Sequence, residues 1–214
     1  MNTSRAISFK DLPGIFKSIH SNTGMGLTCF FSNNDLRIRS LACGYPEYLL
    51  STEINILFHY LPNLFQQTFI ATLLNTGVDV NEATSLTRKS FILKPPYPYV
   101  CLPTVNSTKD IPRCLPSPSR RRIIPLLSKH YVTQLRQMLS ERELTHHSQK
   151  DTSIWDIDRA TATRWLTEAI HRANGDGIQF PLDISLETFK SSYAVYMLTL
   201  GVTPFLLRKF IVGN

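Results

Sequence analysis

Apolar residues recur at three- and four-residue intervals from residue 50 onward, which is the period of one face of an α-helix. The first run lies within residues 51–61 and comprises Ile54, Leu57, Phe58 and Leu61. Ser51 stands at its start as an N-cap candidate. A second, broader apolar run covers residues 62–77, with Pro62 suited to a first turn and Gly77 to a helix end. The pattern therefore predicts two successive helices.

The pattern changes to β-prone runs after a short third helix that is predicted at residues 80–86. Three such runs follow, at residues 90–93, 99–105 and 120–127. Pro95 and Pro96 separate the first two runs, and a loop rich in proline, serine and threonine separates the last two. A hairpin-like pair of strands and a third short strand are the simplest interpretation.

Helical spacing returns in the rest of the chain. The predicted helices cover residues 128–143, 158–173, 185–201 and 203–212, and Ser128 is the N-cap candidate of the first. Five residues of the third share one face: Phe189, Tyr193, Ala194, Met197 and Leu198. The predicted fold class is α+β, mainly α-helical, with one small three-stranded antiparallel sheet.

Composition bounds this picture without changing it. The 214 residues suffice for one substantial domain, or for one domain with a smaller N-terminal piece. In the second case the boundary separates residues 1–48 from residues 49–214. No apolar run reaches the ~20 residues that cross a bilayer, and the N-terminus shows no secretory signal. The four cysteines have no metal-like spacing, so reduced thiols in a cytoplasmic protein are expected. His146 and His147 lack a partner at ligand spacing, which predicts a polar loop, and no cofactor is implied.

Positive charge is concentrated in the middle of the chain. The window from Arg88 to Arg142 holds eleven basic residues and two acids, 11 − 2 = +9, whereas the whole chain carries +7. A local excess of this kind suits a polyanion partner, because neutralising phosphates supplies most non-specific affinity for DNA. A solvated basic face explains the composition equally well.

Two short stretches carry a family resemblance. Residues 75–86, NTGVDVNEATSL, resemble the T-G-x-R-x-x-E-A/L box of tyrosine site-specific recombinases, and residues 185–201, SLETFKSSYAVYMLTLG, resemble their H-x-x-R-H-[ST]-[FY]-A helix. The elements between the boxes follow the same order. Within the family, KPPYPYV and SYAVYML are similar to stretches of plasmid multimer resolvases. The resemblance implies that residues 49–214 form a recombinase catalytic-type domain and that residues 1–48 are an arm or a remnant of a core-binding region.

The resembled family cleaves DNA with a tyrosine nucleophile, while two arginines hold the phosphate and a lysine and a histidine move protons. Arginine suits the clamp because its planar fork stays charged and can grip two phosphate oxygens. In this chain Asp79 stands at the first arginine position, Lys190 at the second and Glu187 at the histidine position. Lys109 is the candidate for the lysine between the second and third strands, and the chain ends before a segment with the nucleophile. The resemblance therefore implies a degenerate, catalytically inactive recombinase.

Tyr193 and Tyr196 are the candidates for a substitute nucleophile. Tyr193 lies on the apolar face of its predicted helix, which favours a role in the core. Tyr196 is expected to be better exposed, but it lies on the wrong element for the family chemistry. The sequence therefore predicts no replacement for the missing tyrosine.

DNA contacts are expected from basic residues on the helix and strand elements. The predicted set is Arg88, Lys89, Arg120, Arg121, Arg122 and Lys190. The three consecutive arginines alternate in facing, so at least one should point outward, either toward DNA or as a charged edge that blocks strand pairing. The last predicted helix carries the apolar residues Phe205, Leu206, Phe210 and Ile211. They predict an exposed apolar patch that promotes self-association or binds a full-length recombinase. The hypotheses are a non-catalytic DNA-binding protein near bacterial DNA, a protein-interaction module on the same fold, or a mobile-element remnant.

Overall fold

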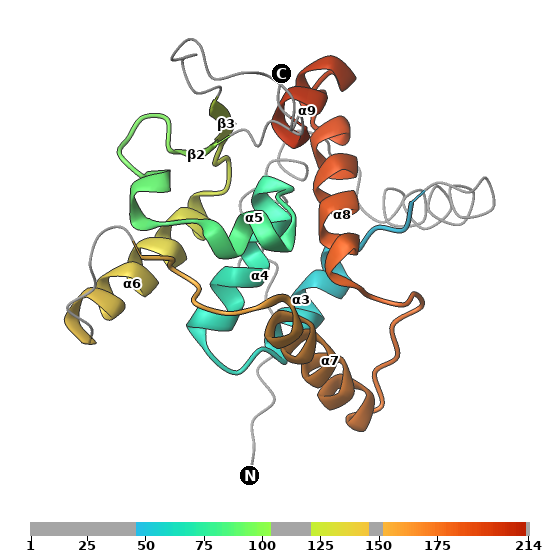
Figure 1. The fold of residues 1–214 in the computed structure, drawn as a ribbon. Coiled ribbons are helices and arrows are strands. Elements are labelled where there is room, and N and C mark those ends of the chain that lie inside the picture. The colour runs from blue at the N-terminus through green and yellow to red at the C-terminus, as the bar shows by residue number, and fades with distance from the viewer. Residues whose placement is uncertain (1–45, 104–120, 146–151, 213–214) are drawn as a thin grey trace, which may run out of the picture.

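A computed structural model describes residues 46–103, 121–145 and 152–212 (Figure 1). The predicted N-terminal piece, residues 1–48, lies almost wholly outside the described residues. The elements in chain order are α3 (Ser51–His59), α4 (Leu64–Thr76), α5 (Val80–Ser85), the 3₁₀ helix η2 (Arg88–Ser90), β1 (Phe91–Ile92), β2 (Tyr99–Pro103), β3 (Arg121–Pro125), α6 (Lys129–Thr145), α7 (Arg159–Gly175), α8 (Leu186–Thr199) and α9 (Pro204–Ile211). The predicted class, mainly helical with one three-stranded antiparallel sheet, is confirmed.

Helix α4 is the centre of the core, and it packs against α6 and α8. Every residue from 68 to 78 is buried, including polar side chains that need internal partners. The hydroxyls of Thr68, Thr72 and Thr76 each donate to the carbonyl four residues earlier, and Thr72 also bonds the Tyr131 hydroxyl at 2.7 Å. These bonds allow a helix with no polar face to lie inside the molecule.

Capping decides where three of the helices begin. Helix α4 starts two residues later than Pro62 suggested, because Asn63 accepts the Gln66 amide as N-cap and Pro62 lies before it. Leu50, not Ser51, stands at the cap of α3, where its amide donates to Glu53. Ser128 caps α6 as predicted, since its hydroxyl accepts the Tyr131 amide at 3.2 Å.

Helix α8 buries a narrower face than its sequence suggested. Phe189, Tyr193 and Met197 are at most 1% exposed, and their four-residue spacing forms one stripe. Leu198 is 45% exposed, so its predicted place on that face is wrong. Successive residues of a helix are rotated by about 100° around its axis. Leu198, the residue after Met197, therefore lies beside the buried stripe and not within it.

Helix α8 also holds the start of the described chain. The Leu49 amide donates to the Ser192 hydroxyl at 2.8 Å, and the Tyr196 hydroxyl donates to the Leu49 carbonyl at 2.5 Å. Both backbone groups of one fully buried residue are thereby satisfied by side chains of α8. Tyr196 therefore has a structural role, and its hydroxyl is engaged and half-buried.

The sheet has the order β1-β2-β3, and both pairings are antiparallel. Its inner face, which packs into the core, carries Phe91, Val100, Leu102, Ile124 and, one residue beyond β3, Leu126. Figure 1 shows β2 and β3 at the upper left of the molecule, with α8 and α9 to their right and α5 and α4 below them. Helix α9 packs against both α8 and β3.

Candidate functional site

The turn between α4 and α5 lies directly against α8. Gly77 ends α4 with φ 64°, a left-handed conformation that favours glycine. A Cβ atom placed on Gly77 would lie 2.3 Å from Cδ1 of Tyr193. The first recombinase-like box therefore needs glycine for both its backbone angle and its contact with the second box.

Two carboxylates organise the start of α5, immediately after this turn. Asp79 is the N-cap, and its carboxylate accepts the Glu82 amide at 2.8 Å. The Glu82 carboxylate accepts the Asp79 amide in return at 3.1 Å. This reciprocal arrangement is a capping box, which satisfies two of the backbone donors that a helix start leaves unpaired.

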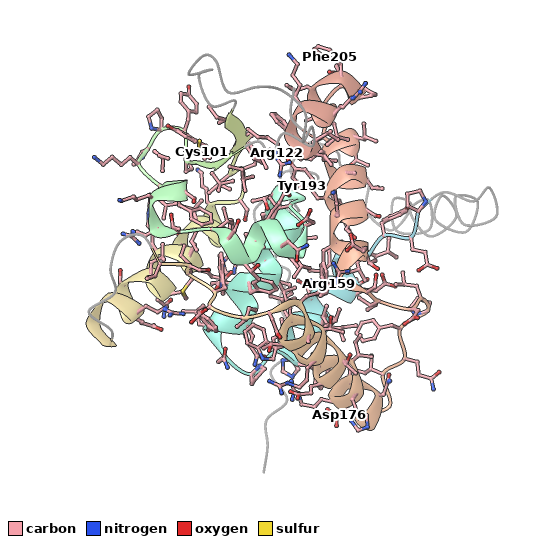
Figure 2. The ribbon with its side chains drawn as sticks, viewed as in Figure 1. Cys101, Arg122, Arg159, Asp176, Tyr193 and Phe205 are labelled. Carbon is pink, nitrogen blue, oxygen red and sulfur yellow. The ribbon has the colours of Figure 1, made fainter. Side chains whose placement is uncertain are left out.

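Arg122 on β3 points inward and completes a charged cluster with these residues (Figure 2). Its Nη2 lies 2.8 Å from Oε2 of Glu82, and its Nη1 donates to the Ile211 carbonyl of α9 at 2.7 Å. The residue is 8% exposed, and its Nε has no hydrogen-bond partner. We therefore withdraw Arg122 from the predicted DNA contacts, because its charge is already paired inside the protein.

The inward orientation of Arg122 follows from the strand period. Ile124 and Leu126 have the same parity along the chain and are buried, whereas Ile123 is 54% exposed. The sequence contained this signal, since an arginine two residues before a core isoleucine shares its face. What the sequence did not contain was the partner, because Glu82 is forty residues away.

Tyr193 adjoins this cluster, and it is part of the core as predicted. Burial raises the pKa of its phenol well above the usual value, although the positive charge of Arg122 acts in the opposite direction. Its hydroxyl also lacks a partner. A phenol held in its protonated form in this way is poorly suited to act as a nucleophile.

The other predicted site residues of α8 lie nearer the surface. Glu187 in its first turn is exposed and pairs with Arg159 of α7 at 2.9 Å. Lys190 is half-buried and forms no ion pair with any residue in the described ranges. Asp79 caps α5, and Glu187 and Lys190 lie on α8. The two recombinase-like boxes contact each other where Gly77, in the turn before α5, packs against the ring of Tyr193 on α8.

The remaining predicted residues are placed only in part. Arg88 and Lys89 are exposed in η2. Arg121 begins β3, but only its backbone is described. Lys109, Arg120 and the pair His146-His147 lie outside the described residues.

Sequence comparison with known proteins decides the family. No family model matches the chain. It is 34% identical over 182 residues to a protein named Resolvase from Escherichia coli strain K12, a match that covers 79% of this chain and 67% of the relative. A probable site-specific recombinase of the afa region from Escherichia coli is 31% identical over 153 residues, covering 72% of this chain and 60% of that protein. The chain belongs to the tyrosine site-specific recombinase family.

Solved structures share the fold of this recombinase-family chain. XerA recombinase matches with a TM-score of 0.58 at 17% identity, over 78% of this chain and 56% of its own. XerH recombinase bound to its difH substrate matches with a TM-score of 0.53 at 17% identity, over 78% of this chain and 47% of its own. The Tn1549 transposon integrase in complex with a circular intermediate DNA has a TM-score of 0.58 at 15% identity, over 78% of this chain and 57% of its own. The chain therefore spans about half the length of the solved recombinases that it matches.

A second surface of this recombinase-family chain lies on α7, and the sequence analysis missed it. One face of the helix is buried, through Ala162, Trp165, Leu166, Ala169 and Ala173. The opposite face lines a shallow groove formed by Arg159, Ala160, Thr163, Arg164, Thr167 and Glu168. The amphipathic pattern predicted this helix. The arginines and threonines at helical spacing on its outer face were not predicted to form a binding surface.

The N-terminal end of α7, where this surface begins, is capped by an aspartate side chain. Asp158 precedes α7 and accepts the Thr161 amide at 2.7 Å, which holds the pKa of its carboxyl below the usual value. The described residues contain no group of three or more potential metal ligands. None of the described helices is long and apolar enough to span a bilayer.

Proposed function

We propose that this chain binds duplex DNA through the exposed face of α7 and does not catalyse strand transfer. The observation that carries the DNA-binding proposal is the outer face of α7, where Arg159, Thr163, Arg164 and Thr167 line one groove. Two of the structural neighbours, XerH and the Tn1549 integrase, are described as complexes with DNA. This likeness in fold supports the proposal.

The dimensions and chemistry of α7 suit a DNA groove. Its 17 residues extend for about 25 Å at ~1.5 Å per residue, and a helix of ordinary diameter enters the major groove, which is about 12 Å wide. Arginine binds phosphates and guanine edges, and threonine hydroxyls and methyls contact backbone and bases. The buried Trp165 and Leu166 anchor the helix, so the outer face is presented on a rigid element.

The proposal of inactivity rests on the residues at the clamp positions. By the match to the family boxes, Asp79 replaces one phosphate-binding arginine, and Lys190 replaces the other. Asp79 is also committed as the cap of α5, and the nearby Arg122 is paired with Glu82. Loss of one preorganised donor typically lowers a rate by ~10²–10³, and a carboxylate at that position adds repulsion. These changes support a DNA-binding protein without the cleavage step.

The first test removes one charge from the α7 face. Arg164→Ala should weaken binding to non-specific duplex DNA and make the slope of log affinity against log salt shallower by about 0.9, the effect of one lost phosphate contact. The Arg164 side chain is 66% exposed and lies 3.9 Å from Glu168, so the change should leave stability nearly unaltered. Fluorescence polarisation over a range of salt concentrations measures both quantities.

Lys209→Ala is the matched control, because it removes the same charge from the exposed part of α9. It should lower affinity less than Arg164→Ala. Equal effects of the two variants, or an unchanged slope for Arg164→Ala, would contradict the placement of the DNA face on α7. Arg88, Lys89, Arg120, Arg121 and Lys190 are further proposed contacts that the same titration can examine one at a time.

The second test concerns chemistry. Incubation with a nicked suicide DNA substrate should give no SDS-resistant protein–DNA adduct, because the phosphate clamp is replaced. A family relative on its own recombination site provides the positive control. Any adduct formed by this chain would refute the proposed inactivity, and mapping it to Tyr196 would require release of the bond to the Leu49 carbonyl.

A protein-interaction module is the second candidate function. It is favoured by the apolar residues that α9 and its end expose, since Phe205 is 71% exposed, Val212 64% and Leu206 41%. Phe210 and Ile211 pack partly against the core, so the predicted apolar surface is smaller than the sequence suggested. The proposed partner is a second copy or a full-length recombinase. A salt titration that detects no DNA binding would favour this candidate, whereas a steep loss of affinity with salt would favour DNA binding.

A further inference from the structure

The outer face of the sheet is apolar although no described element covers it. Cys101 pairs with Ile123 and Tyr99 pairs with Pro125 across β2 and β3. The Leu126 amide donates to the Pro98 carbonyl at 2.9 Å, which continues the ladder and makes Tyr97 and Leu127 the next cross-strand positions. Ile92 of β1 lies opposite Tyr99 on the same side.

This face departs from the usual antiparallel pattern. Such sheets normally alternate apolar residues toward the core with polar residues toward solvent. Here Tyr97 is 82% exposed, Ile123 54% and Leu127 47%, while the positions between them, Val100, Ile124 and Leu126, are buried. A contiguous exposed apolar face on a small sheet marks a surface for a partner.

The charges around the face indicate an anionic partner. Lys94 follows β1 and Lys129 begins α6 two residues after Leu127, and both are exposed. From residue 83 to residue 140 the sequence contains only one acid, Asp110. Like charges would oppose the stacking of two copies through this face, so a second copy of the chain is disfavoured.

The two tyrosines have a spacing that suits nucleic-acid bases. Residues two apart on a strand are separated by about 6.8 Å and project to the same side. Stacked bases lie about 3.4 Å apart along one strand. Tyr97 lies two residues before Tyr99, the first residue of β2. A base inserted between two rings about 6.8 Å apart would lie about 3.4 Å from each, and a further base could stack on the outer side of Tyr97.

We propose that the outer face of the sheet binds single-stranded DNA, with bases stacked on Tyr97 and Tyr99 and the backbone near Lys94 and Lys129. Aromatic platforms beside a positive surface bind single strands because every base has a π-face, whereas the bases of a duplex are already stacked on one another. The inference deepens the proposed DNA-binding function, since it assigns unpaired strands to the sheet and duplex to α7.

The test compares two labelled probes, an oligodeoxythymidylate and a duplex of mixed sequence, by fluorescence polarisation. Tyr97→Ala should weaken binding of the single strand by roughly 5- to 150-fold, the range for loss of one stacked base, and should leave duplex binding unchanged. Tyr97→Phe should bind like the wild type, and Tyr97→Leu should be as weak as Tyr97→Ala. Phe205→Ala is the matched control, because it removes an exposed aromatic ring from α9.

Each outcome separates this inference from the proposed function. Duplex binding that depends on Arg164, without any binding of the single strand that depends on Tyr97, overturns the inference and leaves the proposed function intact. Loss of duplex binding with a persistent Tyr97 effect on the single strand overturns the α7 proposal alone. Polyglutamate serves as a probe for an acidic protein partner. If polyglutamate displaces the oligonucleotide at equal charge, and this displacement also depends on Tyr97, the face binds an acidic protein and the inference is overturned.

Discussion

Replacing Glu82 with alanine is expected to lower the free energy of unfolding by about 3 kcal/mol, near the low end for breaking a buried ion pair. The variant leaves the Arg122 guanidinium buried with the Ile211 carbonyl as its remaining partner, since Arg122 is 8% exposed. It also removes the side chain that accepts the Asp79 amide. The Glu82 side chain is 24% exposed, so water can reach part of the vacated space and limits the loss. Urea unfolding followed by circular dichroism measures the change.

Two companion variants separate charge from capping. Glu82→Gln keeps an oxygen that can accept the Asp79 amide but removes the negative charge, so it should cost less than Glu82→Ala. Combining Glu82→Gln with Arg122→Met removes both charges and should recover part of the stability, because the penalty comes mainly from an unpaired buried cation. A loss below about 1 kcal/mol for Glu82→Ala would mean that Arg122 finds another partner, and the cluster would then have no structural role.

Replacing Gly77 with alanine should lower the free energy of unfolding by about 2–5 kcal/mol, the sum of a left-handed backbone penalty and overpacking. The backbone has φ 64°, and the new Cβ would meet the Tyr193 ring at 2.3 Å. Tyr193 is 1% exposed and cannot move aside without disturbing the contact between α4 and α8. Thermal and urea unfolding of the variant give the magnitude.

Two other glycines provide graded controls for this prediction. Gly201 has φ 84° but open space around it, so Gly201→Ala should show only the backbone penalty of about 1–2 kcal/mol. Gly175 ends α7 with open space and no positive φ, so Gly175→Ala should be neutral or stabilise the protein by up to about 1 kcal/mol. If the loss for Gly77→Ala were no larger than that for Gly201→Ala, the close contact with Tyr193 would not exist in solution.

These expectations bear on why the recombinase-like boxes persist in the chain. Gly77, Glu82 and Tyr193 all belong to the packing and hydrogen bonding that join α4, α5 and α8. Asp79, at a proposed clamp position, is compatible with this structure because a carboxylate is a good N-cap. Selection for the fold alone would therefore retain the outline of both boxes even without the phosphate clamp, as we propose for this chain.

The sequence by itself determined the elements and the class of the fold. Helical and strand periodicity are local properties, so α3 to α9 and the three strands could be predicted to within a few residues, and Ser128 was found as a cap. The order of the boxes around these elements was enough to indicate the recombinase family. Errors at Pro62 and Leu198 arose at helix boundaries and face edges, where the periodic signal is weakest.

Only the tertiary structure decided how the charges and surfaces are used. Arg122 pairs with residues 40 and 89 positions away, and Leu49 is held by α8 from across the chain. No local pattern reports such partners, because a side chain's electrostatic partner depends on which elements pack together. The outer faces of α7 and of the sheet were likewise visible only once their inner faces were known to be buried. Local periodicity specifies which residues share a face, whereas the packing of whole elements decides which face remains open to a partner.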